Sequence, residues 1–306
     1  MPWKSLSHPY KNMKTQRQAD LSLLLVTFFW GIANVVSDIA LGDIDSIQLN
    51  AIRFTVAFLC SYFFFFKKMR KPSAATLKAS AVIGILLCIV YILATEALLY
   101  TDVTNVGFLL AQHVIMVPIL NRVFRKIKTE KKLLLCIGMT LIGLAMLTLK
   151  GGAVNMRSGD WMTLASTFIY AVDMILTEVF VAKEDVDPLQ LGVYQLGVCA
   201  VIFVAIALFT GRSLLVTGTR PWLCILFLAI FSTAFPFIVQ PIAQQLTSVT
   251  RVGLIFSAEP LFTAIAAFVM IGERLHFTAY IGALIMLFAI VLMNVELPAK
   301  REKALK

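Results

Sequence analysis

Long apolar segments alternate with short polar ones along almost the whole chain. The polar segments carry charged residues, glycine or proline, as at 42–46, 67–72 and 183–188. A run of about 20 apolar residues is long enough to cross a bilayer as a helix. The pattern therefore predicts ten transmembrane helices, at 21–41, 48–66, 78–100, 103–121, 133–149, 160–182, 188–210, 222–244, 250–271 and 278–296.

The composition agrees with this pattern. Of 306 residues, 59% are hydrophobic and only 14% are charged, whereas an ordinary soluble domain has about 25% charged residues. The fold class predicted is an all-α polytopic membrane protein.

The distribution of basic residues predicts the orientation, because lysine and arginine are retained on the cytoplasmic side of short loops. The net charge is +10. On one side of the predicted helices the basic residues are only Lys150, Arg157, Arg212, Arg220 and Arg274, and the other side holds many more. Both termini are predicted to be cytoplasmic. Anionic lipid headgroups account for the positive charge, so no nucleic-acid partner is expected.

A short motif occurs twice in the chain. TDVTNVG at 101–107 and TSVTRVG at 247–253 match at five of seven positions, which indicates a duplication with five helices in each half. Since five is odd, the second copy enters the membrane from the opposite face, and the repeats are inverted. The predicted organisation is a basic cytoplasmic tail at 1–20, five-helix repeats at 21–149 and 150–296, and a second basic tail at 297–306.

Inverted repeats are typical of transporters, because a site between them can open to either side. No G-x-x-x-x-G-K-[ST] loop is present, so ATP hydrolysis is not expected. The five cysteines lack metal-ligand spacing. The protein is predicted to be no enzyme, and to need no cofactor or metal.

Several short motifs, in their order and spacing, carry a resemblance to a known family. They are Trp30-Gly31 followed by Asn34, Arg53-Phe54, Pro118, Glu259-Pro260 and Gly272-Glu273. Over about 20–296 the chain resembles the EamA family of the drug/metabolite transporter superfamily. The resemblance implies ten helices, an inverted 5+5 repeat, and transport of small metabolites, often export of amino acids. The segment 122–132 departs from the family, which commonly has Gly-Glu there.

Ionisable residues inside the predicted helices are candidates for substrate contact, since each costs about 2.5 to 3.5 kcal/mol at mid-membrane unless it faces a cavity or a partner. The 146-residue offset between the two motifs also aligns His113 with Glu259. At equivalent depths, they are expected to flank one central cavity. Histidine changes charge near neutral pH, and a desolvated glutamate can hold a proton. Alternatively, the carboxyl group of Glu259 hydrogen-bonds the backbone group that Pro260 leaves without a helical partner.

Two helical faces combine aromatic and polar side chains. One holds Trp30, Asn34 and Asp38, and the other holds Tyr170 and Asp173. This composition suits a pocket that orients a small zwitterion, or else hydrogen bonds that seal helix against helix. The predicted substrate-binding residues are His113, Glu259, Asp173, Tyr170, Trp30, Asn34 and Gln112.

Asp38, Arg53 and Glu96 lie near the predicted outer ends of the first three helices. They are expected to form a charge cluster that acts as an outer gate or as a static ion pair. Pro118 and Pro260 lie inside predicted helices, where proline favours a kink. They are predicted to be hinges, with fixed bends as the alternative.

The sequence thus predicts a secondary transporter in a bacterial cytoplasmic membrane. It is predicted to move small polar or amphipathic metabolites by alternating access, and to export amino acids or related compounds. The alternatives are an uptake carrier for a nucleoside-type compound, a lipid or headgroup flippase, and a membrane-embedded enzyme. Proton coupling, the direction of transport and the oligomeric state stay open.

Overall fold

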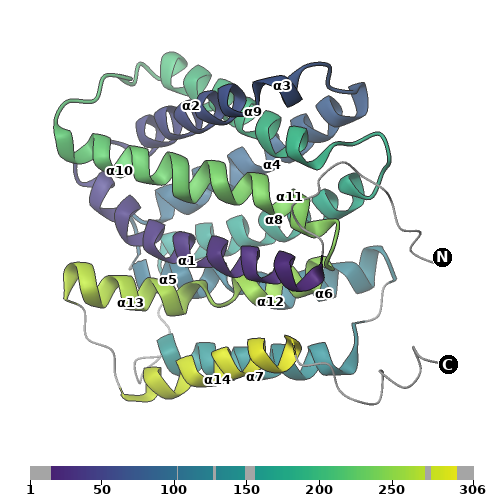
Figure 1. Ribbon diagram of the computed structural model, residues 1–306. Coiled ribbons are helices and arrows are strands. Elements are labelled where there is room, and N and C mark those ends of the chain that lie inside the picture. Colours follow the sequence, from purple (N-terminus) through teal and green to yellow (C-terminus); the bar gives the residue numbers. More distant parts are fainter. Residues whose placement is uncertain (1–14, 102, 127–128, 149–155, 273–276, 295–306) are drawn as a thin grey trace.

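The computed structural model describes residues 15–101, 103–126, 129–148, 156–272 and 277–294. All regular structure in these ranges is helical. Most helices lie roughly along one common direction in Figure 1.

Residues are assigned to elements as follows: α1 (Gln16–Leu41), α2 (Ser46–Phe64), α3 (Phe66–Met69), α4 (Ala74–Ala97), α5 (Val103–Leu110), α6 (His113–Phe124), α7 (Lys131–Thr148), α8 (Ser158–Val181), α9 (Pro188–Phe209), α10 (Thr219–Ala229), the π-helix η1 (Ile230–Ala234), α11 (Phe235–Gln244), α12 (Val249–Phe256), α13 (Glu259–Ile271) and α14 (Phe277–Asn294).

Seven helical segments are long and apolar enough to cross a membrane. They are 16–41, 46–64, 74–97, 158–181, 188–209, 219–244 and 249–270. The apolar helices α6 and α14 are shorter, with 12 and 18 residues. The structure thus confirms a polytopic helical protein, while the count of ten spans stays a prediction.

Side-chain caps fix where several helices begin. Thr15, Asp45, Ser73 and Asp187 each accept a hydrogen bond from a backbone N–H in the first turn of the helix that follows. Such caps satisfy N–H groups that have no partner within the helix. These helices therefore begin at the predicted positions or a few residues before them.

Two of the predicted helical segments contain a short interruption that the sequence did not predict, and the second of them is still one of the seven candidate membrane spans. The segment 103–121 divides where α5 ends at Leu110 and α6 begins at His113. The segment 250–271 divides where α12 ends at Phe256 and α13 begins at Glu259. The two interruptions are 146 residues apart, which is the offset of the repeated motif.

Backbone bonding explains the shape of both interruptions. Val114 N donates to Ala111 O at 3.1 Å, and Leu261 N donates to Ala258 O at 3.1 Å. These bonds span three residues instead of four, which tightens the backbone locally. Pro260 is the second residue of α13, where a missing N–H costs little. Pro118 lies inside α6, and the role of both prolines as hinges stays a prediction.

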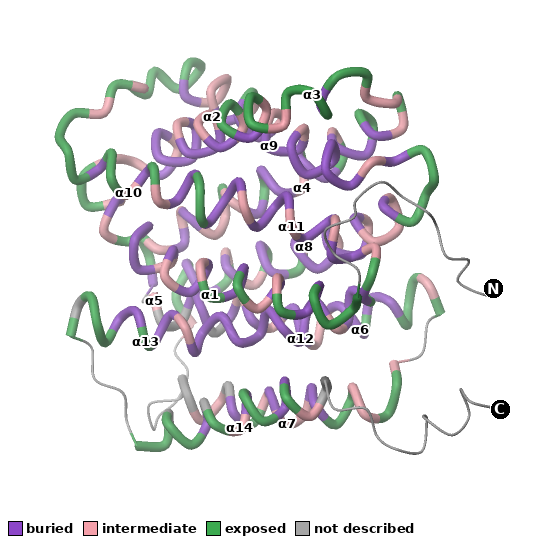
Figure 2. Tube along the Cα trace, in the orientation of Figure 1, coloured by how far each residue is buried: buried purple, intermediate pink, exposed green. Residues whose placement is uncertain are grey.

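Helices from the two halves of the chain pack against one another. The main contacts of this kind join α7 to α14, α2 to α9, α4 to α8 and α9, and α1 to α13. A Cβ on Gly31 would lie 2.4 Å from the Phe262 Cβ, so glycine is required where α1 meets α13. Figure 2 shows the buried positions concentrated where these helices meet.

Polar contacts tie the helix ends together at both ends of the bundle. At one end, here called the basic end, Arg251 contacts Asp20 at 2.6 Å and Arg125 pairs with Glu178. Glu178 also accepts a bond from Val249 N at 2.9 Å. The other end, called the opposite end, holds the exposed pairs Arg212–Asp45 and Arg220–Asp43.

Candidate functional site

A cavity of about 90 Å³ lies between the two halves of the chain. This volume exceeds what one water molecule needs. The residues that line it are Trp30, Ala33, Asn34, Ser37, Arg53, Val90, Tyr91, Ala94, Thr95, Leu98, Val106, Leu110, His113, Tyr170, Ser232, Phe237 and Glu259. Because α1 contributes its second half and α4 its last third, the cavity extends from mid-bundle toward the opposite end.

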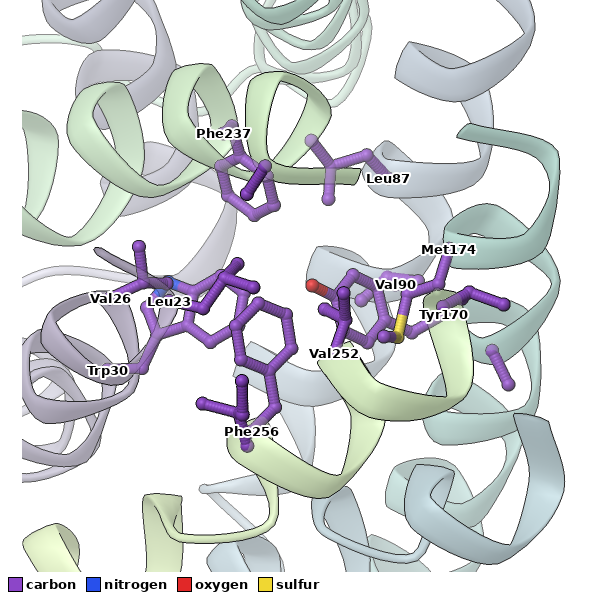
Figure 3. Close-up of a cluster of buried hydrophobic side chains, with 14 of the residues drawn as sticks. Leu23, Val26, Trp30, Leu87, Val90, Tyr170, Met174, Phe237, Val252 and Phe256 are labelled. Atoms are coloured by element: carbon purple, nitrogen blue, oxygen red, sulfur yellow. The ribbon is translucent and has the colours of Figure 1, made fainter. Parts of the chain in front are cut away.

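Aromatic rings form one wall of the cavity. The Trp30 ring lies 6.0 Å from that of Tyr170, 5.7 Å from Phe237 and 4.7 Å from Phe256, between centroids. Figure 3 shows these four side chains approaching from α1, α8, α11 and α12. Trp30 Nε1 donates to Ser232 O at 3.0 Å, which fixes the indole against the wall.

Glu259 lies at the interruption between α12 and α13 and is 6% exposed. Its Oε1 accepts a hydrogen bond from Asn34 Nδ2 at 2.8 Å, across the contact between α13 and α1. Asn34 Nδ2 also donates to Thr263 Oγ1 at 3.1 Å. Asn34 thus orients the carboxyl group at the edge of the cavity.

Arg53 of α2 is 3% exposed and is held by neutral groups. Nε donates to Thr233 Oγ1 at 2.5 Å, and Nη2 donates to Ser232 Oγ at 2.8 Å and Tyr91 OH at 3.3 Å. The guanidinium carbon also lies 4.8 Å from the centre of the Tyr91 ring, a favourable cation–π distance. Ser232 and Thr233 both belong to the π-helix η1. π-Helical turns are frequent at functional sites.

His113 lies at the interruption between α5 and α6 and is bonded to backbone on both sides. Its Nδ1 is 2.6 Å from Leu110 O and its Nε2 is 3.1 Å from Gly253 O. Both partners are acceptors, so a neutral ring donates to one of them at a time and a protonated ring to both. His113 therefore joins α5 and α12 beside the cavity.

Comparison with known proteins decides the family. The model of the EamA-like transporter family matches residues 17–149 and again 157–295. The chain belongs to the EamA-like transporter family. It is therefore a multi-pass membrane protein of a family of transporters, and the family resemblance read from the sequence is confirmed.

Relatives and one solved structure agree with this family. An uncharacterized transporter of Archaeoglobus fulgidus is 26% identical over 278 residues, which cover 91% of this chain and 86% of the relative. The uncharacterized transporter YyaM of Bacillus subtilis is 23% identical over 70% of this chain and 73% of its own. A solved crystal structure covers 90% of this chain and 96% of its own, with 15% identity and a TM-score of 0.74. That likeness shows a shared fold.

In this member of the EamA-like family, the structure brings together five of the residues predicted to bind substrate. Trp30, Asn34, His113, Tyr170 and Glu259 all line the cavity. Their roles in substrate binding stay predictions.

The other two predicted binding residues, Asp173 and Gln112, lie off the cavity lining. Asp173 follows Tyr170 by three residues on α8, so its side chain points about 60° away around the helix. It is 3% exposed, and Oδ1 has no hydrogen-bond partner among the described residues.

The predicted charge cluster does not form in the described part of the chain. Arg53 bonds hydroxyl groups, Glu96 accepts from Ser46 and Asp38 is exposed. The helical period explains the error on α1. Asp38 follows Trp30 by eight residues, which places it about 80° away around the helix, whereas Ser37 follows by seven and is only about 20° away. Ser37 therefore lines the cavity with Trp30, and Asp38 does not.

Several residues that line the cavity were not predicted from the sequence. Tyr91, Ser232 and Phe237 line the cavity, but no periodic pattern of polar residues marks them. Ser37 could have been predicted, because it follows Trp30 by seven residues and therefore shares its helical face. Within the described ranges, no group of three or more His, Cys, Asp or Glu is placed to hold a metal ion.

Proposed function

We propose that this protein is a secondary transporter that exports amino acids or related small polar or amphipathic metabolites by alternating access across the cytoplasmic membrane of a bacterium. The observation that carries the proposal is the position of the cavity. It lies between the two halves of the chain, and helices of both halves line it. A site in that position can be exposed to either side when the halves exchange conformations.

The two ends of the bundle support alternating access. At the basic end, Asp20 pairs with Arg251 and Glu178 pairs with Arg125. Each pair joins two different helices, so opening this end requires both pairs to separate. With the basic end and both termini in the cytoplasm, as the distribution of basic residues predicts, this conformation is closed to the cytoplasm.

The lining favours a carrier over an enzyme. It offers aromatic rings, hydroxyl groups and two ionisable side chains, which is a composition for binding a small molecule. Transport by this site requires neither a cofactor nor nucleotide hydrolysis.

The test is a metabolite profile of cells and medium for the intact protein, Trp30→Ala and Trp161→Ala, produced at matched membrane levels. Trp30 forms the cavity wall, whereas Trp161 is 63% exposed on α8 and serves as the control. We expect an amino acid or related compound to accumulate in the medium with the intact protein and Trp161→Ala, and not with Trp30→Ala. Depletion of a compound from the medium, or equal profiles in all strains, would overturn export.

A further inference from the structure

A second hollow, here called the outer groove, shares no lining residue with the central cavity. Its volume is about 350 Å³, which is within the range of ligand pockets, about 300 to 1,000 Å³. Phe58 of α2, Leu77 of α4 and five residues of α9 contribute to its lining. All three helices are candidate membrane spans. Val201 of α9 is 70% exposed and Leu77 is 44% exposed, so the groove opens toward the lipid around the bundle.

Glycines let the three helices approach one another at the outer groove. A Cβ on Gly197 would lie 2.9 Å from Phe58 Cε2, and a Cβ on Gly84 would lie 2.7 Å from the Val198 Cβ. The Phe58 ring therefore packs on α9 because position 197 has no side chain. Figure 1 shows α2, α4 and α9 as neighbours. The groove is an apolar depression where α2 and α4 both meet α9.

The outer groove reaches the basic end of the bundle. Leu77 lies in the first turn of α4 and Tyr194 in the second turn of α9. Two hydrogen bonds hold the segment after α2 against the same part of α9. Tyr194 OH donates to Met69 O at 2.7 Å, and Gln190 Nε2 donates to Lys68 O at 2.7 Å. This segment therefore lies at the end of the groove.

Basic side chains gather at this end of the outer groove. The five that are exposed here are Lys67, Lys68, Arg70, Lys71 and Lys78. Ser73 Oγ donates to Asp185 O at 2.5 Å, so the loop between α8 and α9 lies nearby. That loop carries three acidic side chains, Glu184, Asp185 and Asp187. The basic residues outnumber them, so the end of the groove attracts an anion.

A row of aromatic rings connects the outer groove with these charges. The ring of Phe58 lies 5.6 Å from that of Tyr62, between centroids. Tyr62 lies 6.5 Å from Tyr194 and 5.9 Å from Phe66. The guanidinium carbon of Arg70 is 5.4 Å from the centre of the Phe66 ring. Aromatic residues are enriched where a membrane meets water, so this row marks the level of the lipid headgroups.

We propose that the outer groove binds an anionic phospholipid, with an acyl chain along the groove and the phosphate at Arg70 and Lys78. In the predicted orientation, the lipid comes from the cytoplasmic leaflet. Basic clusters beside membrane helices bind anionic headgroups, and the apolar groove accommodates the chain. A second copy of the protein fits less well, because a two-fold interface would bring two basic clusters together. The site lies outside the cavity and does not depend on the transported substrate.

The test measures lipid binding to the purified protein in detergent by native mass spectrometry. Dioleoylphosphatidylglycerol is anionic, and dioleoylphosphatidylcholine has the same chains without net charge. We expect the anionic lipid to bind at least about fivefold more tightly. Glycerol 3-phosphate, which has the charge without the chains, should not bind. Equal binding of the two lipids, or binding of glycerol 3-phosphate as tight as that of the anionic lipid, would overturn the proposal.

Charge variants show whether the headgroup binds at this cluster. Arg70→Gln combined with Lys78→Gln should weaken binding of the anionic lipid at least about tenfold, since each basic residue near a lipid surface contributes about fivefold. Arg122→Gln combined with Lys126→Gln is the matched control, because it removes two exposed charges near the end of α6. It should leave binding unchanged. An equal loss in both double variants would mean that the overall charge attracts the lipid, and no site would remain.

A larger side chain tests whether the acyl chain occupies the outer groove. Val201→Trp should fill the groove and weaken binding severalfold, and the 70% exposure of Val201 leaves room for the ring without disturbing the core. Val269→Trp is the control, since Val269 is 75% exposed on α13. Unchanged binding by Val201→Trp would overturn the proposal. A changed oligomeric state in that variant, with unchanged lipid binding, would assign the groove to a second copy of the chain.

Discussion

The two halves of the chain interrupt a helix at corresponding positions and use the interruption differently. In the first half, both ring nitrogens of His113 face backbone carbonyl oxygens, those of Leu110 and Gly253. In the second half, Glu259 accepts one bond from Asn34 and keeps Oε2 without a donor among the described residues. One side chain is committed to the protein, and the other is available to a ligand.

The chemistry of the two side chains explains this difference. At the first interruption, Val114 N bonds Ala111 O, and the Leu110 carbonyl is bonded by His113. A histidine N–H can donate to a carbonyl oxygen, but an ionised carboxylate only accepts. Glu259 therefore turns to the amide of Asn34. Equivalent backbone positions thus carry a side chain whose ring nitrogens both face backbone in one half, and a carboxyl group bonded through one oxygen to Asn34 in the other.

The largest effect should come from removing the available carboxylate. Glu259→Leu deletes the polar group in the cavity and leaves the Asn34 amide with only Thr263 as acceptor. Truncating one partner of a buried charge pair costs about 2 to 5 kcal/mol, so we expect transport in proteoliposomes to fall at least about 30-fold. Glu184→Gln is the control. Transport within twofold of the intact protein would show that Glu259 is not needed by the substrate.

His113→Phe should lower stability more than it changes transport. The replacement leaves the carbonyl contacts of Leu110 and Gly253 without the ring donors, and an unsatisfied buried polar group costs about 1 to 3 kcal/mol. We expect a lower midpoint of thermal unfolding in detergent, with His113→Gln intermediate because it keeps one donor. The KM of the folded fraction should stay within about threefold. A large increase in KM at unchanged unfolding midpoint would instead place His113 in contact with the substrate.

A smaller effect is expected from the residue that orients the carboxylate. Asn34→Ala removes the hydrogen bond to Glu259 Oε1 but leaves the charge in place. A hydrogen bond to a charged group contributes about 1.5 to 3 kcal/mol, and the substrate ammonium replaces part of it. We therefore expect the KM to rise about tenfold with kcat nearly unchanged, measured by initial rates of transport. A fall in kcat alone would mean that Asn34 acts in the conformational change.

Much of the fold follows from the sequence, because apolar length and capping residues are local signals. Asp45 and Asp187 mark the starts of α2 and α9 directly. The repeated heptapeptide also aligned His113 with Glu259, and both line the cavity. The interruptions after Leu110 and Phe256 escaped prediction because tertiary contacts, such as those of His113, replace the backbone bonds lost there.

The site was less accessible to prediction than the fold. Arg53 was assigned to an ion pair because the sequence shows carboxylates at a similar depth, but not the hydroxyl groups that η1 presents to it. The π-helix that carries Ser232 and Thr233 has no spacing signal in the sequence. Asp173 was placed in the pocket because it was taken to share a helical face with Tyr170. The two residues differ by about 60° around α8, and Asp173 does not line the cavity.

The smallest effect is expected at the buried carboxyl group outside the cavity. Asp173 is as buried as the cavity residues, but it does not line the cavity, and its Oδ1 has no hydrogen-bond partner in the described ranges. Asn has nearly the same shape and no charge to bury. Asp173→Asn should therefore leave KM and kcat within about twofold, and should maintain or raise the unfolding midpoint, because burying an unpaired ionised group is costly.

The same acid-to-amide change at Glu259 tests whether this residue, and not Asp173, is the buried acid that transport requires. Glu259→Gln should impair transport of a zwitterion while Asp173→Asn does not, although both residues are buried acids within the bundle. Transport rates of the two variants and the intact protein should be compared from pH 5.5 to 8.5. If Asp173→Asn alone abolished transport and its pH dependence, Asp173 would carry a proton in the transport cycle. The division between a ligand-binding acid and a packing acid would then be wrong.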